Sequence, residues 1–202
     1  MPNYKLMYWE GARGRGEYVR LLLTAIGQKW EEVPVAFQDW PSLKSNTPFG
    51  QLPILEVDGQ KLAQTSAIVN FLARRYGLAG ENEWEQALVE SVVAATSDIF
   101  TAMGKVVMSP EGQKATEGQK YQQEIFNPAL KYWEKFISEH GTNGYTVGNK
   151  ITAADIAIYN VLDSTLLLNL TTKDFIDGFP KVKEVVNKVR SHDKLSGYAK
   201  KH

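Results

Sequence analysis

The chain has 202 residues, of which 43% are hydrophobic and 23% charged, the balance of a globular protein with one large core or two smaller ones. Lys plus Arg and Asp plus Glu both number 23, and the resulting net charge of zero argues against a nucleic-acid-binding protein, which is usually basic. The absence of cysteine excludes disulfides, thiolate metal sites and a redox thiol carried by the protein itself.

The first elements of the chain alternate between strand and helix. "YKLMYW" predicts a strand, and "EYVRLLLTAIG", after the glycine-rich turn "GARGRG", predicts a helix that ends at Gly27. "WEEVPVAF" predicts a second strand that is either irregular or at a sheet edge, because Pro34 has no N–H for a neighbouring strand. Residues 4–36 are therefore expected to form a β-α-β unit. The G-x-x-G-x-G spacing of the turn differs from that of a dinucleotide-binding loop, so its glycines predict only a tight turn.

A hairpin and a helix follow a loop with several prolines. "QDWPSLKSNTPFG" predicts a short helical turn within that loop. "PILEV" and "QKLA" predict a hairpin around Asp58 and Gly59, and "TSAIVNFLARRYG" predicts a helix that ends at Gly77. This order of elements, with Pro53 opening the hairpin, is the plan of a thioredoxin-like fold, in which a proline at this place is commonly cis.

From Trp84 onward the sequence shows helical periodicity and no convincing strand. "EWEQALVESVVAATSDIFTAMGKVV" predicts one long helix, and "GQKYQQEIFNPALKYWEKFISEHG" predicts another with a bend at Pro128. In "NKITAADIAIYN", Thr152 and Asp155 have the spacing of a helix-capping box, so the pattern predicts a structural role for Asp155 rather than a catalytic one.

The change in pattern after "LAGENE" predicts two domains. Residues 1–78 are expected to form an α/β thioredoxin-like N-terminal domain, and residues 79–83 a linker. Residues 84–202 are expected to form an all-α C-terminal helical bundle.

A candidate binding site surrounds Pro53. A cis bond before Pro53 would turn Leu52 outward, so that its N–H and C=O could pair with an extended peptide. Gln64 and Thr65 stand where the next helix begins, and N–H groups at a helix N-terminus together with a hydroxyl make a carboxylate site. The pattern therefore predicts a site for a small peptide with a free carboxylate. The alternative, that Gln64 and Thr65 only cap the helix, stays open.

These stretches together resemble a known family. "MPNYKLMYW", "RGRGEYVR", "QDWPSLK", "PFGQLPILEVDG", "QTSAI" and "VGNKITAADIAIY" span both predicted domains and resemble the cytosolic glutathione transferases. They look most like the sigma class and its nematode relatives, a class that includes prostaglandin D synthases. The resemblance implies a homodimeric enzyme that uses glutathione as co-substrate and conjugates its thiolate to small hydrophobic electrophiles, a detoxification reaction.

The resemblance also implies roles for single residues. Tyr8 matches the catalytic tyrosine, and Arg15 matches the arginine near the sulfur, with Arg13 as a rival because the loop after Trp9 looks one residue longer than usual. The positions that match glutathione-binding residues are Tyr8, Trp40, Lys44, Gln51, Leu52, Pro53, Gln64 and Thr65, with Asp98 reaching the site of the neighbouring subunit. The electrophile pocket is expected to be lined by Trp9, Arg13, Phe100, Gly104 and Ala157.

The chemistry supports a donor role for Tyr8. A free thiol has a pKa of about 8.5, and lowering it by about 2 units requires about 2.7 kcal/mol of selective thiolate stabilisation. A phenol hydroxyl that donates to sulfur, with an arginine nearby, can supply that stabilisation.

Expectations about partners follow from what the sequence does not contain. No metal site is predicted, because the three histidines are isolated and Ala94 and Ser97 leave Asp98 without neighbouring acids. No apolar signal segment opens the sequence and no apolar run approaches about 18 residues, so a cytoplasmic protein without a membrane partner is expected. The end "YAKKH" is short for the family, which would leave the electrophile pocket more open.

Other functions stay open beside the conjugating enzyme. One is a ligand carrier for haem or other hydrophobic molecules, and another is a prostaglandin-isomerising enzyme of the sigma class. A third is a structural protein like the lens crystallins that resemble this family, although Tyr8 and the predicted glutathione residues argue against a purely structural role.

Overall fold

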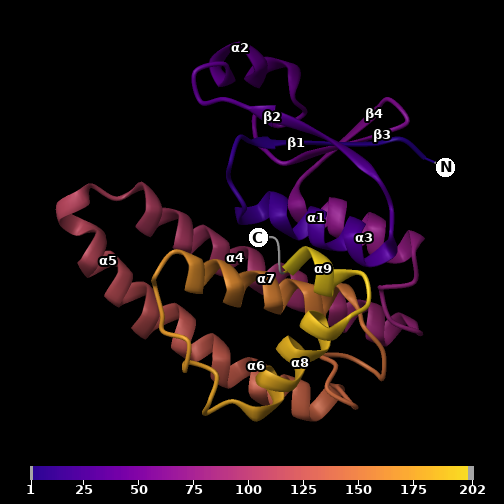
Figure 1. Cartoon of the computed structure of the whole chain (residues 1–202), viewed down its shortest axis with the longest axis vertical. Helices are drawn as coiled ribbons and strands as arrows, with labels where there is room; N and C mark the ends of the chain where they lie inside the picture. Colours follow the sequence, from indigo (N-terminus) through magenta and orange to yellow (C-terminus); the bar gives the residue numbers. More distant parts are fainter. Residues whose placement is uncertain (1, 200–202) are drawn as a thin grey trace.

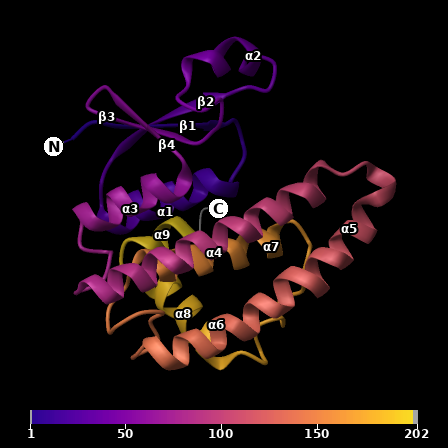
Figure 2. The same cartoon turned by 180° about the vertical axis from the view of Figure 1, so that it is seen from behind.

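The computed structural model describes residues 2–199, and it begins with a four-stranded mixed sheet of order β2-β1-β3-β4. The central strand β1 pairs in parallel with β2 and antiparallel with β3, which pairs antiparallel with β4. Two helices, α1 and α3, lie between the sheet and the helical part of the chain, and α2 lies beyond the opposite face (Figures 1 and 2). The bounds are β1 Tyr4–Trp9, α1 Gly14–Ile26, β2 Trp30–Val35, α2 Trp40–Leu43, β3 Ile54–Val57, β4 Gln60–Ala63 and α3 Thr65–Arg75.

The sheet confirms the strand predictions. Alternate residues of β1 are buried, so Tyr4, Leu6 and Tyr8 share one face of the sheet. Pro34 lies in the edge strand β2, opposite Tyr8, where its missing N–H costs no ladder hydrogen bond. Asp58 has a φ of 50° in the two-residue turn of the β3–β4 hairpin.

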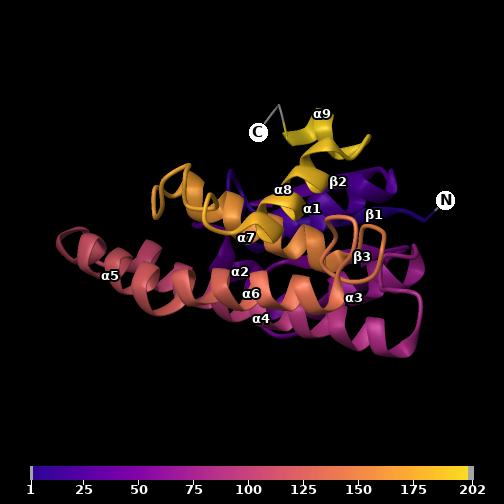
Figure 3. The same cartoon turned by 90° about the horizontal axis from the view of Figure 1, so that it is seen from below.

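The rest of the chain is a bundle of helices (Figure 3). The central helix α7 packs against α1, α4 and α8. Beyond residue 83, the only strand-like pairing in the described part of the chain is a single bridge between Gly141 and Gly148. The bounds are α4 Glu83–Met108, α5 Lys114–Lys120, α6 Asn127–His140, α7 Ala153–Leu167, α8 Pro180–Ser191 and α9 Leu195–Ala199.

The predicted bend near Pro128 takes the form of a π-helical turn. Residues Tyr121–Phe126 form this turn between α5 and α6, and Pro128 follows it in the first turn of α6. Because Pro128 has no N–H for the carbonyl of Glu124, the regular hydrogen-bond ladder cannot pass through this place.

Helix α4 bears on the expectation that no apolar run approaches about 18 residues. It has 26 residues, and an 18-residue window within it has a mean hydropathy of 1.2, so it is long and apolar enough to cross a membrane by length and composition alone. The face that carries Val89 and Val93 is buried in the hydrophobic core, as in the core helix of a bundle.

The loop between α3 and α4 is packed rather than free. Leu78 and Ala79 are buried in a hydrophobic core that extends through both parts of the chain, and the Leu78 carbonyl accepts the N–H of Ala153. This packing joins the two parts of the chain and does not mark residues 79–83 as a separate linker. The division into residues 1–78, 79–83 and 84–202 stays a prediction. Its last residues, 200–202, and with them most of the short "YAKKH" end, lie outside the described residues.

Asp155 is a buried carboxylate that holds two segments of the helical part together. Its buried carboxylate accepts the backbone N–H groups of Thr152 and Thr146, each at 2.6 Å, and the Thr152 hydroxyl at 3.0 Å. Burial raises the pKa of Asp155 to about 6, although these hydrogen bonds oppose the rise. The predicted capping box is confirmed, and the same carboxylate also holds the loop before α7.

We expect Asp155→Ala to lower the free energy of unfolding by about 1–3 kcal/mol, because two buried N–H groups lose their acceptor. Urea unfolding followed by circular dichroism measures this loss. The control is Asp174→Ala, which removes an exposed carboxylate bonded to Thr172 and should change stability by less than about 0.5 kcal/mol. Equal stability of the two variants would contradict the structural role of Asp155.

Candidate active site

A cavity of about 490 Å³ lies where the end of β1, the loop before β3 and the start of α3 meet α4. It brings together most of the residues that the sequence predicts to bind glutathione, and it adds Ser66 and two polar residues of α4. Its lining is Trp9, Arg15, Trp40, Gly50, Gln51, Leu52, Pro53, Gln64, Thr65, Ser66, Ser97 and Thr101.

The segment before β3 offers its backbone to this cavity. The Leu52–Pro53 peptide bond is cis, as the sequence predicts. Within residues 2–199, no hydrogen bond uses the backbone N–H or C=O of Leu52. An extended peptide can therefore pair with Leu52 in the manner of an added strand.

The start of α3 forms the polar end of the cavity. Gln64 has a φ of 71°, uncommon for a residue other than glycine, and such conformations gather at functional sites. Its side chain does not cap α3 but donates to the Gln51 side chain at 2.8 Å. The first turn of α3 contains Thr65 and Ser66 and no acidic residue, so the positive end of the helix is available to an anion.

Tyr8 is 8% exposed and is not among the residues that line this cavity, although Trp9, the next residue of β1, is. The backbone N–H of Arg15 donates to its hydroxyl oxygen at 3.1 Å. A Cβ atom at Gly14 would lie 2.8 Å from that oxygen, and one at Gly16 would collide with the ring, so the turn can approach Tyr8 only with glycine at both places. Tyr8 lines a second cavity of about 380 Å³, and Trp9 lines both cavities.

Burial keeps Tyr8 protonated. It raises the pKa of the Tyr8 phenol, and this effect outweighs the N–H groups of Arg15 and Gly16 and the guanidinium groups of Arg15 and Arg20, which lower it. At neutral pH the hydroxyl is therefore a hydrogen-bond donor rather than a base.

The structure separates the two candidate arginines. Arg15 lines the cavity, and its guanidinium donates to the Ser97 carbonyl at 2.9 Å and to the Thr101 hydroxyl at 2.8 Å. Arg13 instead forms ion pairs with Glu17 at 3.0 Å and Asp163 at 2.8 Å. Arg15 is thus the arginine placed for a ligand in this cavity.

The predicted lysine and aspartate lie outside the lining. The exposed Lys44 runs past Gly50, where a Cβ atom would lie 3.1 Å from its Cε atom. Asp98 is exposed on α4, next to Ser97, and does not line the cavity of its own chain. A residue outside the prediction, Phe37, stacks on Trp9 with ring centroids 4.6 Å apart and is 74% exposed.

The five residues predicted to line the electrophile pocket are not brought together by these two cavities, so that pocket stays a prediction. Only Trp9 of its five residues lines one of these cavities. Ala157 is fully buried because α7 is covered on several sides, and Phe100 faces the core with 9% of its surface exposed. Arg13 is held in ion pairs, and Gly104 lies on α4 outside the lining of both cavities.

No group of three or more His, Asp or Glu side chains within residues 2–199 could hold a metal ion. The residues that the sequence did not suggest are Ser66, Ser97, Thr101 and Phe37. Ser97 and Thr101 stand four residues apart, which places them on one face of a helix, but this spacing is too common to mark a site.

Comparisons with known proteins agree with the resemblance. The family profile "Glutathione S-transferase, N-terminal domain" matches residues 5–74, and "Glutathione S-transferase, C-terminal domain" matches residues 97–202. Glutathione S-transferase 1 of Ascaris suum is 38% identical over 94% of this chain and 92% of its own length.

Two solved structures illustrate the range of similar proteins. A Pi-class glutathione S-transferase of Onchocerca volvulus is 31% identical, with a TM-score of 0.87, over 98% of this chain and 92% of that one. A monomeric glutathione S-transferase of the hookworm Necator americanus is 35% identical, with a TM-score of 0.83, over 99% and 97% of the two chains.

We expect Thr65→Ala to weaken glutathione binding roughly 10- to 100-fold, because a carboxylate would lose a charge-assisted hydrogen bond. Thr65→Ser keeps the hydroxyl and is the matched control. Gln64→Gly should also weaken binding while leaving the fold as stable as before, since glycine tolerates the positive φ. Titration calorimetry measures both affinities. Wild-type affinity in Thr65→Ala and Gln64→Gly would contradict a role for the start of α3 in binding glutathione.

Proposed function

The chain belongs to the glutathione S-transferase family, and from that premise we propose which of its residues bind glutathione and activate its thiol. The observation that carries the proposal is the shared cavity, which unites Leu52, the start of α3 and Arg15, a residue whose backbone N–H donates to the Tyr8 hydroxyl oxygen. The electrophiles that the enzyme conjugates are small hydrophobic molecules. They approach the sulfur of glutathione beside Trp9, which borders both cavities.

Glutathione binds as an extended peptide in this proposal. Its γ-glutamyl carboxylate accepts hydrogen bonds from the N-terminus of α3 and the Thr65 hydroxyl, and its cysteinyl backbone pairs with Leu52. Its glycyl carboxylate lies near Trp40 and Lys44, where the lysine supplies the positive charge. The unpaired backbone of Leu52 and the acid-free first turn of α3 support this direction of the peptide.

The reaction needs a thiolate that persists at neutral pH. The Tyr8 hydroxyl donates to the sulfur, and the Arg15 guanidinium adds positive charge at the same side of the cavity. The thiol proton leaves to solvent, and the sulfur then forms a C–S bond with the electrophilic carbon. A leaving group departs with its bonding electrons in a substitution, or the acceptor carbon takes up a proton in an addition. Tyr8 remains protonated throughout.

We also propose that the enzyme is a homodimer in which Asp98 reaches the γ-glutamyl amine in the other subunit. The exposed face of α4 carries small side chains, Ser91, Ala94 and Ala95, beside Asp98, which permits close approach of a second chain. Phe49, in the loop before β3, is 67% exposed and offers apolar surface to a partner. Because one similar structure is titled monomeric, the assembly has to be measured.

The finer placement of the enzyme is also part of this proposal. The motifs quoted above support a sigma-like, nematode-type enzyme, whereas one similar structure carries a Pi-class label. A detoxifying role in the cytoplasm agrees with the resemblance, and a glutathione site without metal agrees with the chemistry assigned to Tyr8.

We expect Tyr8→Phe to raise the pKa of the bound thiol from about 6.5 towards about 8.5 and to lower conjugation strongly, because only the thiolate loses a donor. Glutathione affinity should change by less than about threefold, since the peptide contacts lie elsewhere. Thiolate absorbance in the ultraviolet, followed against pH with glutathione bound, measures the pKa.

Tyr4→Phe is the matched control. Tyr4 lies on the same face of β1, but its hydroxyl bonds to that of Tyr76 at 2.7 Å, away from the cavity. It should leave the pKa of the thiol as in the wild type. If Tyr8→Phe also left it there, the role assigned to Tyr8 would be wrong.

The shared site predicts a distinctive mixed dimer. Pairing an Asp98→Ala subunit with a Gln64→Ala subunit places both defects in one site and leaves the other intact. We expect about half of wild-type activity at the wild-type Michaelis constant for glutathione, because only one site works. Sedimentation showing a fully active monomer at micromolar concentration would exclude sharing across an interface.

A further inference from the structure

The turn between β1 and α1 is held by α7, from the other end of the chain. The Arg13 guanidinium donates to the Asp163 carboxylate at 2.8 Å, and the Asn160 side-chain amide donates to the Gly14 carbonyl at 3.3 Å. The partners stand 150 and 146 residues apart in the sequence. Asn160 and Asp163 are three residues apart on α7, so one face of that helix supplies both contacts.

Both contacts lie in a partly dehydrated interface. Asn160 is 1% exposed, and the side chains of Asp163 and Arg13 are 17% and 27% exposed. An ion pair at such a place depends less on solvent and salt than one on the open surface. Removing one partner also leaves the other charge poorly compensated.

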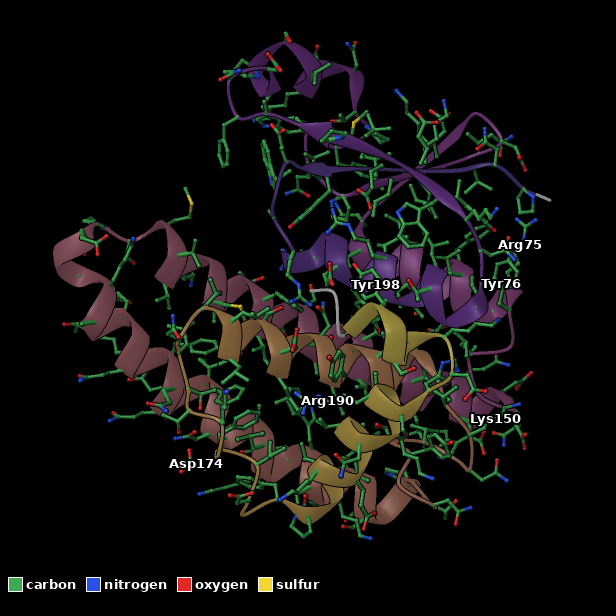
Figure 4. All side chains as sticks on the ribbon, viewed as in Figure 1. Arg75, Tyr76, Lys150, Asp174, Arg190 and Tyr198 are labelled. Atoms are coloured by element: carbon green, nitrogen blue, oxygen red, sulfur yellow. The ribbon has the colours of Figure 1, made fainter. Side chains whose placement is uncertain are left out.

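The charges around Asp163 come from several elements. Arg13 faces it from the β1–α1 turn, Glu17 from α1 and Arg190 from α8, while Tyr159 is its neighbour on α7. Figure 4 shows Arg190 beside α7 and α8. Burial raises the pKa of Asp163, and the guanidinium groups of Arg13 and Arg190 oppose that rise.

The held turn is the part of the backbone that contacts Tyr8. Arg13 and Gly14 directly precede Arg15, whose N–H donates to the Tyr8 hydroxyl oxygen. That bond polarises the phenol O–H and makes it a better donor to sulfur. There is no room for a Cβ atom between Gly14 and this oxygen, so a shift of the turn by a fraction of an ångström changes the position of the hydroxyl.

We propose that Asp163 and Asn160 are positioning residues for the glutathione transferase reaction, which act by fixing the Arg13–Arg15 turn against the Tyr8 hydroxyl. This inference rests on the role proposed for Tyr8. Arg13 is then the anchor of the turn, and Arg15 is the arginine that faces the ligand. The helical part of the chain contributes in this way to thiol activation without touching glutathione.

The test is the Asp163→Asn variant, which removes the charge and keeps the shape of the side chain. We expect the pKa of the bound thiol to rise by about 0.5–1 unit and kcat/KM to fall roughly tenfold, the scale of loss from a slightly misplaced catalytic group. Glutathione affinity should stay within about threefold of wild type, because the peptide contacts proposed at Leu52 and at the start of α3 lie outside the turn.

The interaction between Arg13 and Asp163 can be tested with a double variant. Arg13→Ala removes this ion pair together with the one to Glu17, so it should shift the pKa of the thiol at least as much, and adding Asp163→Asn to it should cause no further shift. Lys183→Ala is the matched control, since it breaks an ion pair with Asp177 at 2.9 Å that does not reach the turn. It should leave the pKa of the thiol and kcat/KM unchanged.

If folded Asp163→Asn had the wild-type thiol pKa and the wild-type kcat/KM, the proposal would be wrong. A lower melting temperature in that variant would not rescue it, because the ion pair would then act on stability alone. Additive effects of Arg13→Ala and Asp163→Asn would overturn it as well. The Tyr8→Phe measurement separates the two levels. If Tyr8→Phe shifts the pKa of the thiol and Asp163→Asn does not, the proposed function stands and only this inference fails.

Discussion

The hydrogen bond from the Arg15 N–H to the Tyr8 hydroxyl oxygen is the constraint on which the site depends. It requires the start of α1 to pass over the Tyr8 ring, which only glycine at positions 14 and 16 permits. The same approach buries Tyr8, and burial keeps the phenol protonated. The contact fixes the place of the hydroxyl that we propose as the donor to sulfur, and the burial that comes with it keeps that hydroxyl protonated.

The helical part of the chain supports this contact from the other side. Helix α7 packs against α1, and the Tyr18 hydroxyl donates to the Ala153 carbonyl at 2.6 Å, at the first residue of α7. The start of α7 is in turn fixed by Asp155, which accepts N–H groups from two segments. A folding signal in the second half of the sequence therefore contributes to the geometry of a site in the first half.

The sequence predicts the parts of this structure that depend on local chemistry. Pro34 indicates an irregular or edge strand, Asp58 and Gly59 a hairpin, and Thr152 and Asp155 a helix start, because each follows from the conformations that nearby residues allow. The thioredoxin-like order of elements adds the cis bond before Pro53, whereas the hydrogen bond from Gln64 to Gln51 is seen only in the structure.

Contacts between distant residues are where the sequence is a poor guide. The pairing of Arg13 with Asp163 has no local signal, and without it the choice between Arg13 and Arg15 stays open. The burial of Phe100 and Ala157 has no local signal either, since the faces of α4 and α7 that turn inward depend on helices elsewhere in the chain. The sequence predicts only a bend at Pro128, whereas the structure has a π-helical turn before it. The form of the turn depends on hydrogen bonds of several residues that adjust together.

The most direct test of the account is a crystal structure of the enzyme with glutathione bound. The account predicts the sulfur within about 3.5 Å of the Tyr8 hydroxyl oxygen, with the cysteinyl backbone paired to Leu52 and the γ-glutamyl carboxylate at the start of α3. A glutathione molecule in this cavity with its sulfur more than about 5 Å from Tyr8, too far for a hydrogen bond, would contradict it.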